Sequence, residues 1–342
     1  TSSSDPAVDT NPDGGLGTVW ANTTSGEMYA CTDATAGSNV WTNMGDGTGD
    51  IAPYVYAGSS YAYAVAGSWP VIKTIDKYSL SSDGDGVYAN FDLTASKTYM
   101  GSQHAQSLTH GFIFGGYTSS ATNVIEKFSF SVDATAVDIG NLTTAHYNVG
   151  GCNSQSYAYR LGGGDPSADV IDRVAMDSGT DAADVGDLIG EATTPQTNTE
   201  GDTYGYLSGS SNATHVLTVQ KVQLVSSANS VDTGSNLTVA RAGGGTSSST
   251  THGYTAGGPD APPTVTIDRY AFGSSSDATD VGDLAVAVRY CASASSTTHG
   301  YNAGNATGST KDIEKYSYAS SASGSRIGDL SAIHKNGGGC HV

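Results

Sequence analysis

The chain has 342 residues and carries 14 Lys and Arg against 33 Asp and Glu, a formal net charge of −19. Nucleic acids and anionic membranes are bound through clustered Lys and Arg, so this composition argues against both kinds of partner. No run of about 18 apolar residues occurs, and we therefore expect no membrane insertion.

The first 49 residues predict an arm followed by a small β-meander. Residues 1–16 are rich in Ser, Asp, Pro and Gly, which predicts a flexible or docking arm. Residues 18–22 and 27–32 are alternating runs around a Gly-containing turn, and this pattern predicts a hairpin. Residues 39–43 predict a third strand. Two of the three tryptophans lie in these strands, so we expect an aromatic centre or a docking face over residues 17–49.

Residues 17–33 read Gly-x-x-Trp-x-Asn-Thr-Thr-x-Gly-Glu-x-Tyr-x-Cys-Thr-Asp. This pattern resembles a short module of bacteriophage tail-fibre and other virion proteins, where it often precedes repeats. Ala21 and Ala30 stand where a β-branched residue is more usual. The resemblance covers 17 of the 342 residues, about a twentieth of the chain; it implies a virion structural protein and says nothing about a reaction.

From about residue 50 the chain consists of six copies of one unit, marked by two recurring residues. The apolar residue that opens an Ile-Asp-Arg signature recurs every 46 to 50 residues, at Ile75, Ile125, Ile171, Val219, Ile267 and Ile313. The leucine that closes the unit recurs every 46 to 49 residues, at Leu93, Leu142, Leu188, Leu237, Leu284 and Leu330. A period of about 40 to 50 residues built from short strands is typical of β-propeller blades. We therefore predict an all-β chain with one six-bladed propeller over residues 50–342.

Each unit is expected to contain four strands. In the fifth unit we predict an innermost strand over residues 238–248, then strands over 251–257, 265–272 and 278–284. The innermost strand is rich in Gly, Ala and Ser because strands that converge on an axis leave little room for side chains. For the first blade, either residues 331–342 or residues 51–60 could supply this strand, and the sequence leaves both open.

The order Arg241, Gly257-Gly258 and then Ile-Asp-Arg-Tyr at 267–270 resembles the kelch repeat. The comparison covers residues 50–342 and implies a kelch-like propeller. Val281 and Ile327 stand where kelch repeats usually carry Trp on the outer strand, so kelch partners are not carried over.

Three histidines occur in the same Thr-His-Gly context, at His110, His252 and His299. They could form a ring of metal ligands or a pH switch. Equivalent positions in separate blades rarely come within ligand distance, so we favour a hydrogen bond from each imidazole to a neighbouring strand.

Aspartates at three-residue spacing recur in two units, at Asp181, Asp184 and Asp187 and at Asp277, Asp280 and Asp283. Calcium binds such oxygen clusters, but no EF-hand loop is present and Asp also forms turns. We expect no cofactor, with calcium as the open alternative.

Five third strands carry an acid followed by a base: Asp76-Lys77, Glu126-Lys127, Asp172-Arg173, Asp268-Arg269 and Glu314-Lys315. The fourth unit carries Gln220-Lys221 instead. Because neighbouring side chains of a strand point to opposite faces, we expect each charge to pair with a neighbouring blade rather than to form a catalytic dyad.

No nucleophile elbow, P-loop or zinc-protease motif occurs, and we predict a non-enzymatic protein. The module at 17–33 implies a virion component, located in an extracellular particle. We favour a tail-fibre or tail-tip protein that recognises a glycan or protein of the host surface. The N-terminal module is expected to bind other virion proteins, and the protein to be a homo-oligomer within the particle. The alternatives are a capsid head-fibre or decoration protein and, in another class, a secreted bacterial adhesin or a propeller-type glycan-active enzyme.

The connections after the second strand vary most between copies and should share one face, where a rigid scaffold presents them for recognition. The ligand-binding candidates on this face are Trp69, Tyr117, Asp165, Asp260 and Asn305. Trp69, the only tryptophan of the repeats, suits stacking on a sugar or packing within its blade.

Overall fold

Strands are the only regular elements in the part of the chain that the structure, a computed structural model, describes. The described residues are 1–45, 51, 54–68, 70–101, 103–164, 166–212, 214–258, 264–321 and 323–342. Within them no helix is long and apolar enough to cross a membrane. The prediction of an all-β chain is confirmed. The chain forms two compact units, Thr1–Val55 (unit 1) and Tyr56–Val342 (unit 2).

Unit 1 is built on a three-stranded antiparallel sheet of order β1-β2-β3, with strands Val19–Ala21, Met28–Asp33 and Val40–Asn43. Tyr29 and Trp41 are fully buried against it, and the ring of Trp20 meets Trp41 edge-on at 5.9 Å between centroids. Residues of the predicted arm hydrogen-bond this sheet. Ser2 N donates to Ala21 O at 3.0 Å, and both the backbone N and the side-chain amide of Asn39 donate to Val8 O.

Unit 2 contains six antiparallel sheets among its described residues, called the first to the sixth sheet in chain order. The first is β28-β4-β5-β6, with strands Gly338–His341, Tyr61–Gly67, Ile72–Ser79 and Val87–Lys97. The second is β7-β8-β9-β10, with Ala105–Gln106, His110–Phe114, Thr122–Ser129 and Val137–His146. The third is β11-β12-β13-β14, with Gly150–Asn153, Tyr157–Gly163, Ala168–Ala175 and Ala183–Asp187.

The remaining three sheets repeat the same antiparallel order. The fourth joins β15 (Thr197–Thr199), β16 (Tyr204–Ser208), β18 (Thr214–Gln223) and β19 (Val231–Arg241), with the short β17 (Ser211–Asn212) also paired to β18. The fifth is β20-β21-β22-β23, with Gly245–Ser248, His252–Ala256, Thr266–Ala271 and Thr279–Asp283. The sixth is β24-β25-β26-β27, with Ala292–Ser295, His299–Asn305, Thr310–Ser317 and Ser325–Asp329.

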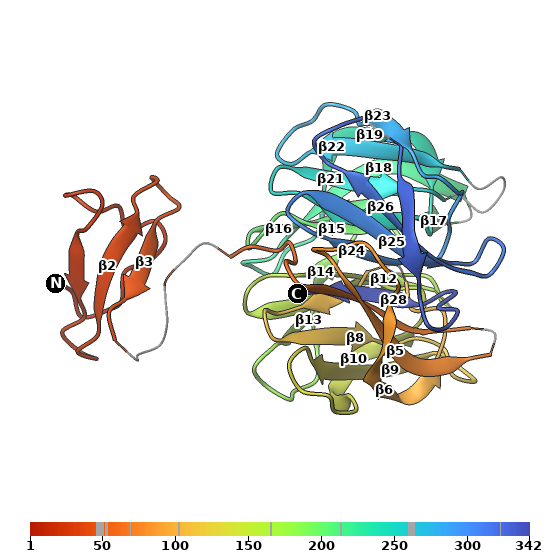
Figure 1. Cartoon of the computed structure of the whole chain (residues 1–342), viewed down its shortest axis with the longest axis horizontal. Coiled ribbons are helices and arrows are strands. Elements are labelled where there is room, and N and C mark those ends of the chain that lie inside the picture. The colour runs from red at the N-terminus through yellow and green to blue at the C-terminus, as the bar shows by residue number, and fades with distance from the viewer. Residues whose placement is uncertain are drawn as a thin grey trace. The chain divides into compact units, whose positions relative to one another are not determined.

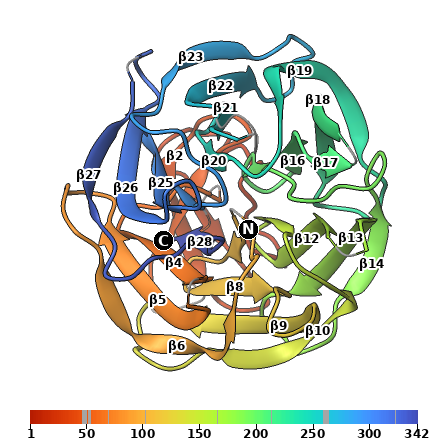
Figure 2. The same ribbon diagram turned by 90° about the vertical axis from the view of Figure 1, so that its right-hand side faces the viewer.

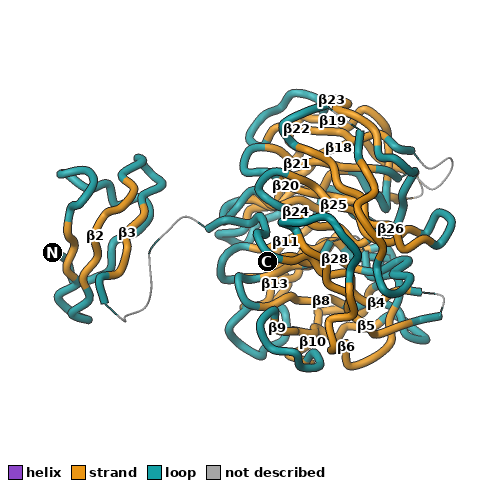
Figure 3. Tube along the Cα trace, viewed as in Figure 1, coloured by secondary structure: helices purple, strands orange, loops and turns teal. Residues whose placement is uncertain are grey.

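The sheets of unit 2 follow one another around a ring, as the strand labels show in Figure 2, and Figure 1 shows the same sheets from the side. The antiparallel order places successive connections at opposite ends of the strands (Figure 3). We call "turn face" the end with the connections from first to second and from third to fourth strand. We call "loop face" the end with the connections from second to third strand and from sheet to sheet.

Residues 338–341 supply the innermost strand of the first sheet. Strand β28 pairs antiparallel with β4, and Cys340 lies opposite Tyr63. Of the two segments that the sequence left open, the C-terminal one therefore completes this sheet. Glycine is needed here because a Cβ on Gly339 would come within 2.2 Å of the carbonyl oxygen of Ser293.

The predicted innermost strand over residues 238–248 is wrong, because this segment belongs to two sheets. Residues up to Arg241 are part of β19, which pairs with β18 of the fourth sheet, and β20 of the fifth sheet begins at Gly245. Gly243 lies between them with φ 66°. The positive φ interrupts the extended backbone where the chain crosses from the rim of one sheet to the centre of the next.

Every crossing between sheets has a residue with positive φ six residues after the closing leucine, and these residues form what we call the crossover ring: Tyr99, Asn148, Thr194, Gly243, Tyr290 and Asn336. Each backbone N–H from Asn148 to Asn336 donates to the carbonyl oxygen of the preceding member, over 2.6 to 3.3 Å. Met100 N donates to Asn336 O at 3.1 Å and completes the circle. The six sheets are thus joined by a cyclic chain of backbone hydrogen bonds.

A second recurring contact, which we call the acid clamp, joins the third strand of each sheet to the sheet before it. A buried acid, or Gln220 in the fourth sheet, accepts a backbone hydrogen bond from the first or second residue after the closing leucine of the preceding sheet. The donor and acceptor pairs are Ser331 and Asp76, Thr94 and Glu126, Thr143 and Asp172, Ile189 and Gln220, Thr238 and Asp268, and Val286 and Glu314, at 2.6 to 3.2 Å.

The charge of the clamp is balanced differently from sheet to sheet. Three acids meet a basic side chain four residues after that leucine, in the pairs Lys97–Glu126 (2.6 Å), Arg241–Asp268 (2.9 Å) and His334–Asp76 (3.3 Å). Asp172 instead pairs with Arg160 of its own sheet at 2.6 Å, which departs from the expected pairing between blades.

Glu314 is the one clamp acid with no Lys, Arg or His at ion-pair distance among the described residues. The position that carries a cation in other copies is Val288 here. Burial raises the pKa of Glu314, and the hydrogen bonds from the backbone of Ala285 and Val286 only partly oppose this. The fourth sheet has a neutral clamp, because Gln220 faces a crossing that carries Ala192.

We predict that Glu314→Gln increases the free energy of unfolding by about 1 kcal/mol at neutral pH, because the amide oxygen still accepts from Val286 while the buried charge disappears. Gln220 already fills the equivalent position in this way. The control Asp268→Asn should cost ~3–5 kcal/mol, since Arg241 is left buried without its counter-charge. Denaturant unfolding measures both.

The pH dependence gives an independent check on the charge of Glu314. Its folded pKa lies above the ordinary value of 4.5, so the folded state binds the proton more tightly and wild-type stability falls as pH rises through the range between these two values. The advantage of Glu314→Gln should therefore grow with rising pH over that range. An advantage that does not change with pH contradicts this account.

Candidate functional site

Three of the five ligand-binding candidates, Trp69, Asp165 and Asp260, lie outside the described residues. Asn305 is described, and its side chain is 2% exposed. Its Oδ1 accepts from the backbone N of Arg289 (3.1 Å) and Thr307 (2.8 Å), and its Nδ2 donates to Ala287 O (2.9 Å). These contacts hold the crossing that leads into the sixth sheet.

Tyr117 lies on the loop face in a cluster of three tyrosines with Tyr99 and Tyr147, which we call the tyrosine cluster. Ring centroids are 5.6 Å apart for Tyr99–Tyr147 and Tyr117–Tyr147 and 6.1 Å apart for Tyr99–Tyr117. The backbones of Tyr117 and Thr98 exchange two hydrogen bonds, and Tyr147 O accepts from Gly164 N. The rings are thus presented by loops whose backbones are anchored.

Tyr99 combines exposure with an unfavourable backbone conformation. Its side chain is 40% exposed and its φ is 54°, a region that costs a bulky residue about 1 kcal/mol or more. Strained residues of this kind concentrate at binding sites. The sequence feature that could have identified Tyr99 is its position six residues after a closing leucine, where two other copies have Asn148 and Asn336.

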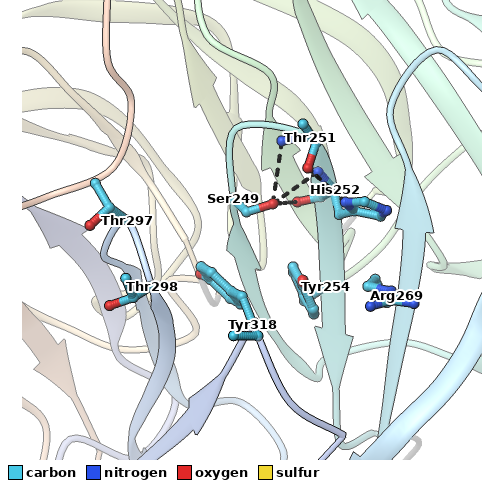
Figure 4. Close-up of a pocket in the computed structure, with 9 residues that line it drawn as sticks. Ser249, Thr251, His252, Tyr254, Arg269, Thr297, Thr298 and Tyr318 are labelled. Carbon is cyan, nitrogen blue, oxygen red and sulfur yellow. Dashed lines mark hydrogen bonds between the residues drawn. The ribbon is translucent and has the colours of Figure 1, made fainter.

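A groove lies on the turn face between the fifth and sixth sheets, and we call it the inter-sheet groove (Figure 4). Its volume is about 300 Å³. The first-to-second turn and the central strands of the fifth sheet contribute Thr251, His252, Tyr254 and Arg269, and the sixth sheet contributes Thr298 and Tyr318. The sequence alone did not indicate this site, since it combines two units of the repeat.

The groove has an aromatic wall and a polar rim. Tyr318 stacks on Tyr254 with 4.4 Å between ring centroids and 21° between planes. At the rim, Ser249 Oγ accepts from the backbone N of Thr251 (3.3 Å) and His252 (3.0 Å). Burial, and secondly the charge of Arg269, lower the pKa of His252, so its imidazole is neutral at pH 7. Arg269 therefore supplies the charge of the groove.

The three Thr-His-Gly histidines do not hydrogen-bond a neighbouring strand, so that expectation is wrong. In each case Nδ1 pairs with the hydroxyl of the preceding threonine, at 2.9 Å for His110 and 2.8 Å for His252 and His299. The threonine is the nearest partner because both side chains lie at the same tight turn. Within the described ranges, no group of three or more His, Cys, Asp or Glu could hold a metal ion.

The spaced aspartates act as hydrogen-bond acceptors between and within sheets. Asp277 Oδ1 accepts from the backbone N (2.9 Å) and the side chain (3.2 Å) of Asn236 in the preceding sheet, and Asp181 contacts Asn141 in the same way. Asp280 Oδ1 accepts from Gly282 N at 3.0 Å. These bonds are the turn-forming role that Asp often takes.

No protein-family model and no curated protein sequence matches the chain. The resemblances to kelch repeats and to a virion module therefore stay predictions, and the site is argued from its geometry.

We predict that Asn305→Ala destabilises unit 2 by ~1–3 kcal/mol, because it leaves two backbone N–H groups and one carbonyl oxygen without partners in a buried crossing. Thermal and denaturant unfolding measure the loss. Thr307→Ala is a matched control in the same loop, because Asn305 bonds the backbone of Thr307 rather than its side chain. Equal losses in the two variants would contradict the role given to Asn305.

Proposed function

We propose that the protein is a non-enzymatic component of a bacteriophage virion that recognises a glycan of the host surface. In this proposal unit 2 is a six-bladed, kelch-like β-propeller, and unit 1 is the module that attaches it to other virion proteins. A tail fibre or tail tip is the proposed location, with several copies in each particle.

The propeller is supported by the way the sheets are joined. Six sheets of equivalent strand order follow one another in a ring, and the C-terminal strand β28 completes the sheet that begins with β4. Closure of this kind removes free sheet edges and gives a rigid platform for variable loops. The crossover ring and the acid clamps add a link at each junction.

The tyrosine cluster is the observation that carries the binding proposal. Exposed tyrosines offer a flat apolar face with a polar hydroxyl, which suits a sugar ring and its hydroxyl groups. Tyr99 is 40% exposed and lies beside the other two rings, whereas Tyr290, with a similar φ, lies outside the cluster. Tyr117 was a candidate from sequence alone, and the other two rings extend the surface around it.

The virion setting is supported by residues 17–33, whose pattern resembles a module of tail-fibre and other virion proteins. In unit 1 the module has a core of its own, with Trp41 and Tyr29 fully buried. Mass spectrometry of purified phage particles tests this setting. If the protein is absent from particles in which the other tail proteins are found, the virion assignment is excluded.

We predict that Tyr99→Asn weakens binding of the host-surface glycan without lowering the melting temperature. Asn occupies the equivalent backbone position at 148 and 336 with a similar φ, so the variant relieves strain while removing a ring of the cluster. Affinity for the bacterial surface polysaccharide selected on a glycan array should fall roughly tenfold or more.

Tyr290→Asn is the matched control, since Tyr290 occupies the same position of the crossover ring with φ 48° but lies outside the tyrosine cluster. It should keep the native affinity. Equal affinity of Tyr99→Asn and the native chain would refute the binding surface, and so would equal losses in both variants.

A further inference from the structure

We propose that the inter-sheet groove on the turn face binds a carboxylated saccharide, with Arg269 holding the carboxylate and Tyr318 supporting the sugar ring. This site is separate from the tyrosine cluster and does not depend on the virion assignment. The groove brings together an arginine, stacked aromatic rings and several hydroxyl groups. These groups are suited to bind the carboxylate, the ring face and the hydroxyl groups of the saccharide.

The charge of the groove is unusual for this chain. The net charge of the protein is −19, yet none of the described residues that line the groove is acidic. Arg269 is half-buried on β22, beside the neutral imidazole of His252. A planar guanidinium that has no carboxylate partner in its groove is suited to bind a carboxylate through two parallel hydrogen bonds.

Two of the equivalent cations in other sheets lie next to acids. Lys221 lines a smaller groove of about 170 Å³ between the fourth and fifth sheets, and Asp232 lines the same groove. Lys315 forms an ion pair with Asp83 of the first sheet. Ala319 of the sixth sheet lines the groove, and the sequence of residues 319–324 contains no acid. Unlike Lys221 and Lys315, Arg269 thus has no acid beside it in its groove.

The remaining walls suit a sugar. Tyr318 is half-buried and stacks on the buried Tyr254, so its orientation is held by a second ring. Thr251 and Thr297 are exposed at the rim, where hydroxyls can exchange hydrogen bonds with sugar hydroxyls (Figure 4). A volume of about 300 Å³ is at the lower end of small-molecule sites and fits one or two sugar residues better than a large ligand.

The other copies of the repeat provide variants that keep the fold. Position 318 corresponds to Leu80 and Leu224, so Tyr318→Leu removes the ring but keeps a side chain that two other sheets accommodate. Position 269 is Lys in four copies, so Arg269→Lys keeps the charge but loses the bidentate geometry. Arg269→Gln removes the charge, and Lys221→Gln is its control in the neighbouring groove.

Titration calorimetry of the full chain with a glucuronic-acid oligosaccharide, a neutral glucose oligosaccharide of equal length and a sulfated one tests the proposal. We expect binding of the carboxylated probe, with affinities at least tenfold weaker for the neutral and sulfated probes. Arg269→Gln and Tyr318→Leu should each weaken binding roughly tenfold or more, and Arg269→Lys by several-fold. Lys221→Gln should leave the affinity unchanged.

Equal affinity for the neutral or the sulfated probe would overturn the assignment of a carboxylate. Unchanged affinity in both Arg269→Lys and Tyr318→Leu would overturn the site, and these two variants remain informative if Arg269→Gln does not fold. The variant Tyr99→Asn should bind the carboxylated probe like the native chain, so failure of the proposed host-recognition surface is distinguishable from failure of this site.

Discussion

The hydrogen bond from the backbone of one sheet to the buried acid of the next is the contact on which unit 2 depends. It explains why two sequence markers recur together. The acid follows the apolar residue of the Ile-Asp-Arg signature, and its donor follows the closing leucine of the preceding repeat, as in Thr238 and Asp268. A backbone donor is present whatever the side chain, so the six junctions keep the same geometry while their sequences diverge.

What differs between junctions is the balance of charge. A buried carboxylate needs a cation or must be replaced by a neutral acceptor, because desolvation of an unpaired charge is costly. Lys97, Arg160 and Arg241 supply a cation, the imidazole of His334 contacts Asp76, and Gln220 is the neutral acceptor. Among the described residues, Glu314 is the one clamp acid without a basic side chain at ion-pair distance. The clamp residues and their partners recur in the repeat and hold the sheets together. We therefore expect ligand recognition at positions where single copies depart from the repeat pattern.

Both proposed binding surfaces lie at such departures. On the loop face, Tyr99 shares its backbone position with Tyr290, but of these two only Tyr99 belongs to the tyrosine cluster, with rings from two further connections. On the turn face, the inter-sheet groove combines Arg269, which has no acid beside it there, with Tyr318, whose position carries Leu, Met or Phe in the other copies. The repeat thus forms a common scaffold, and residues that differ between copies at its two faces form the proposed binding sites.

The sequence by itself determined the all-β class, the six copies and the strands within each copy, because strand patterns and turn residues are local. It misplaced the boundary near Gly243, since the alternation of residues 238–248 does not show that the chain changes sheets there. The choice of residues 338–341 to complete the first sheet, the pairing of Asp172 with Arg160, and the groove between Tyr254 and Tyr318 were decided only by the tertiary structure. Each of these three features brings together residues that the repeat pattern does not relate to one another. They come into contact only when the sheets have formed and packed.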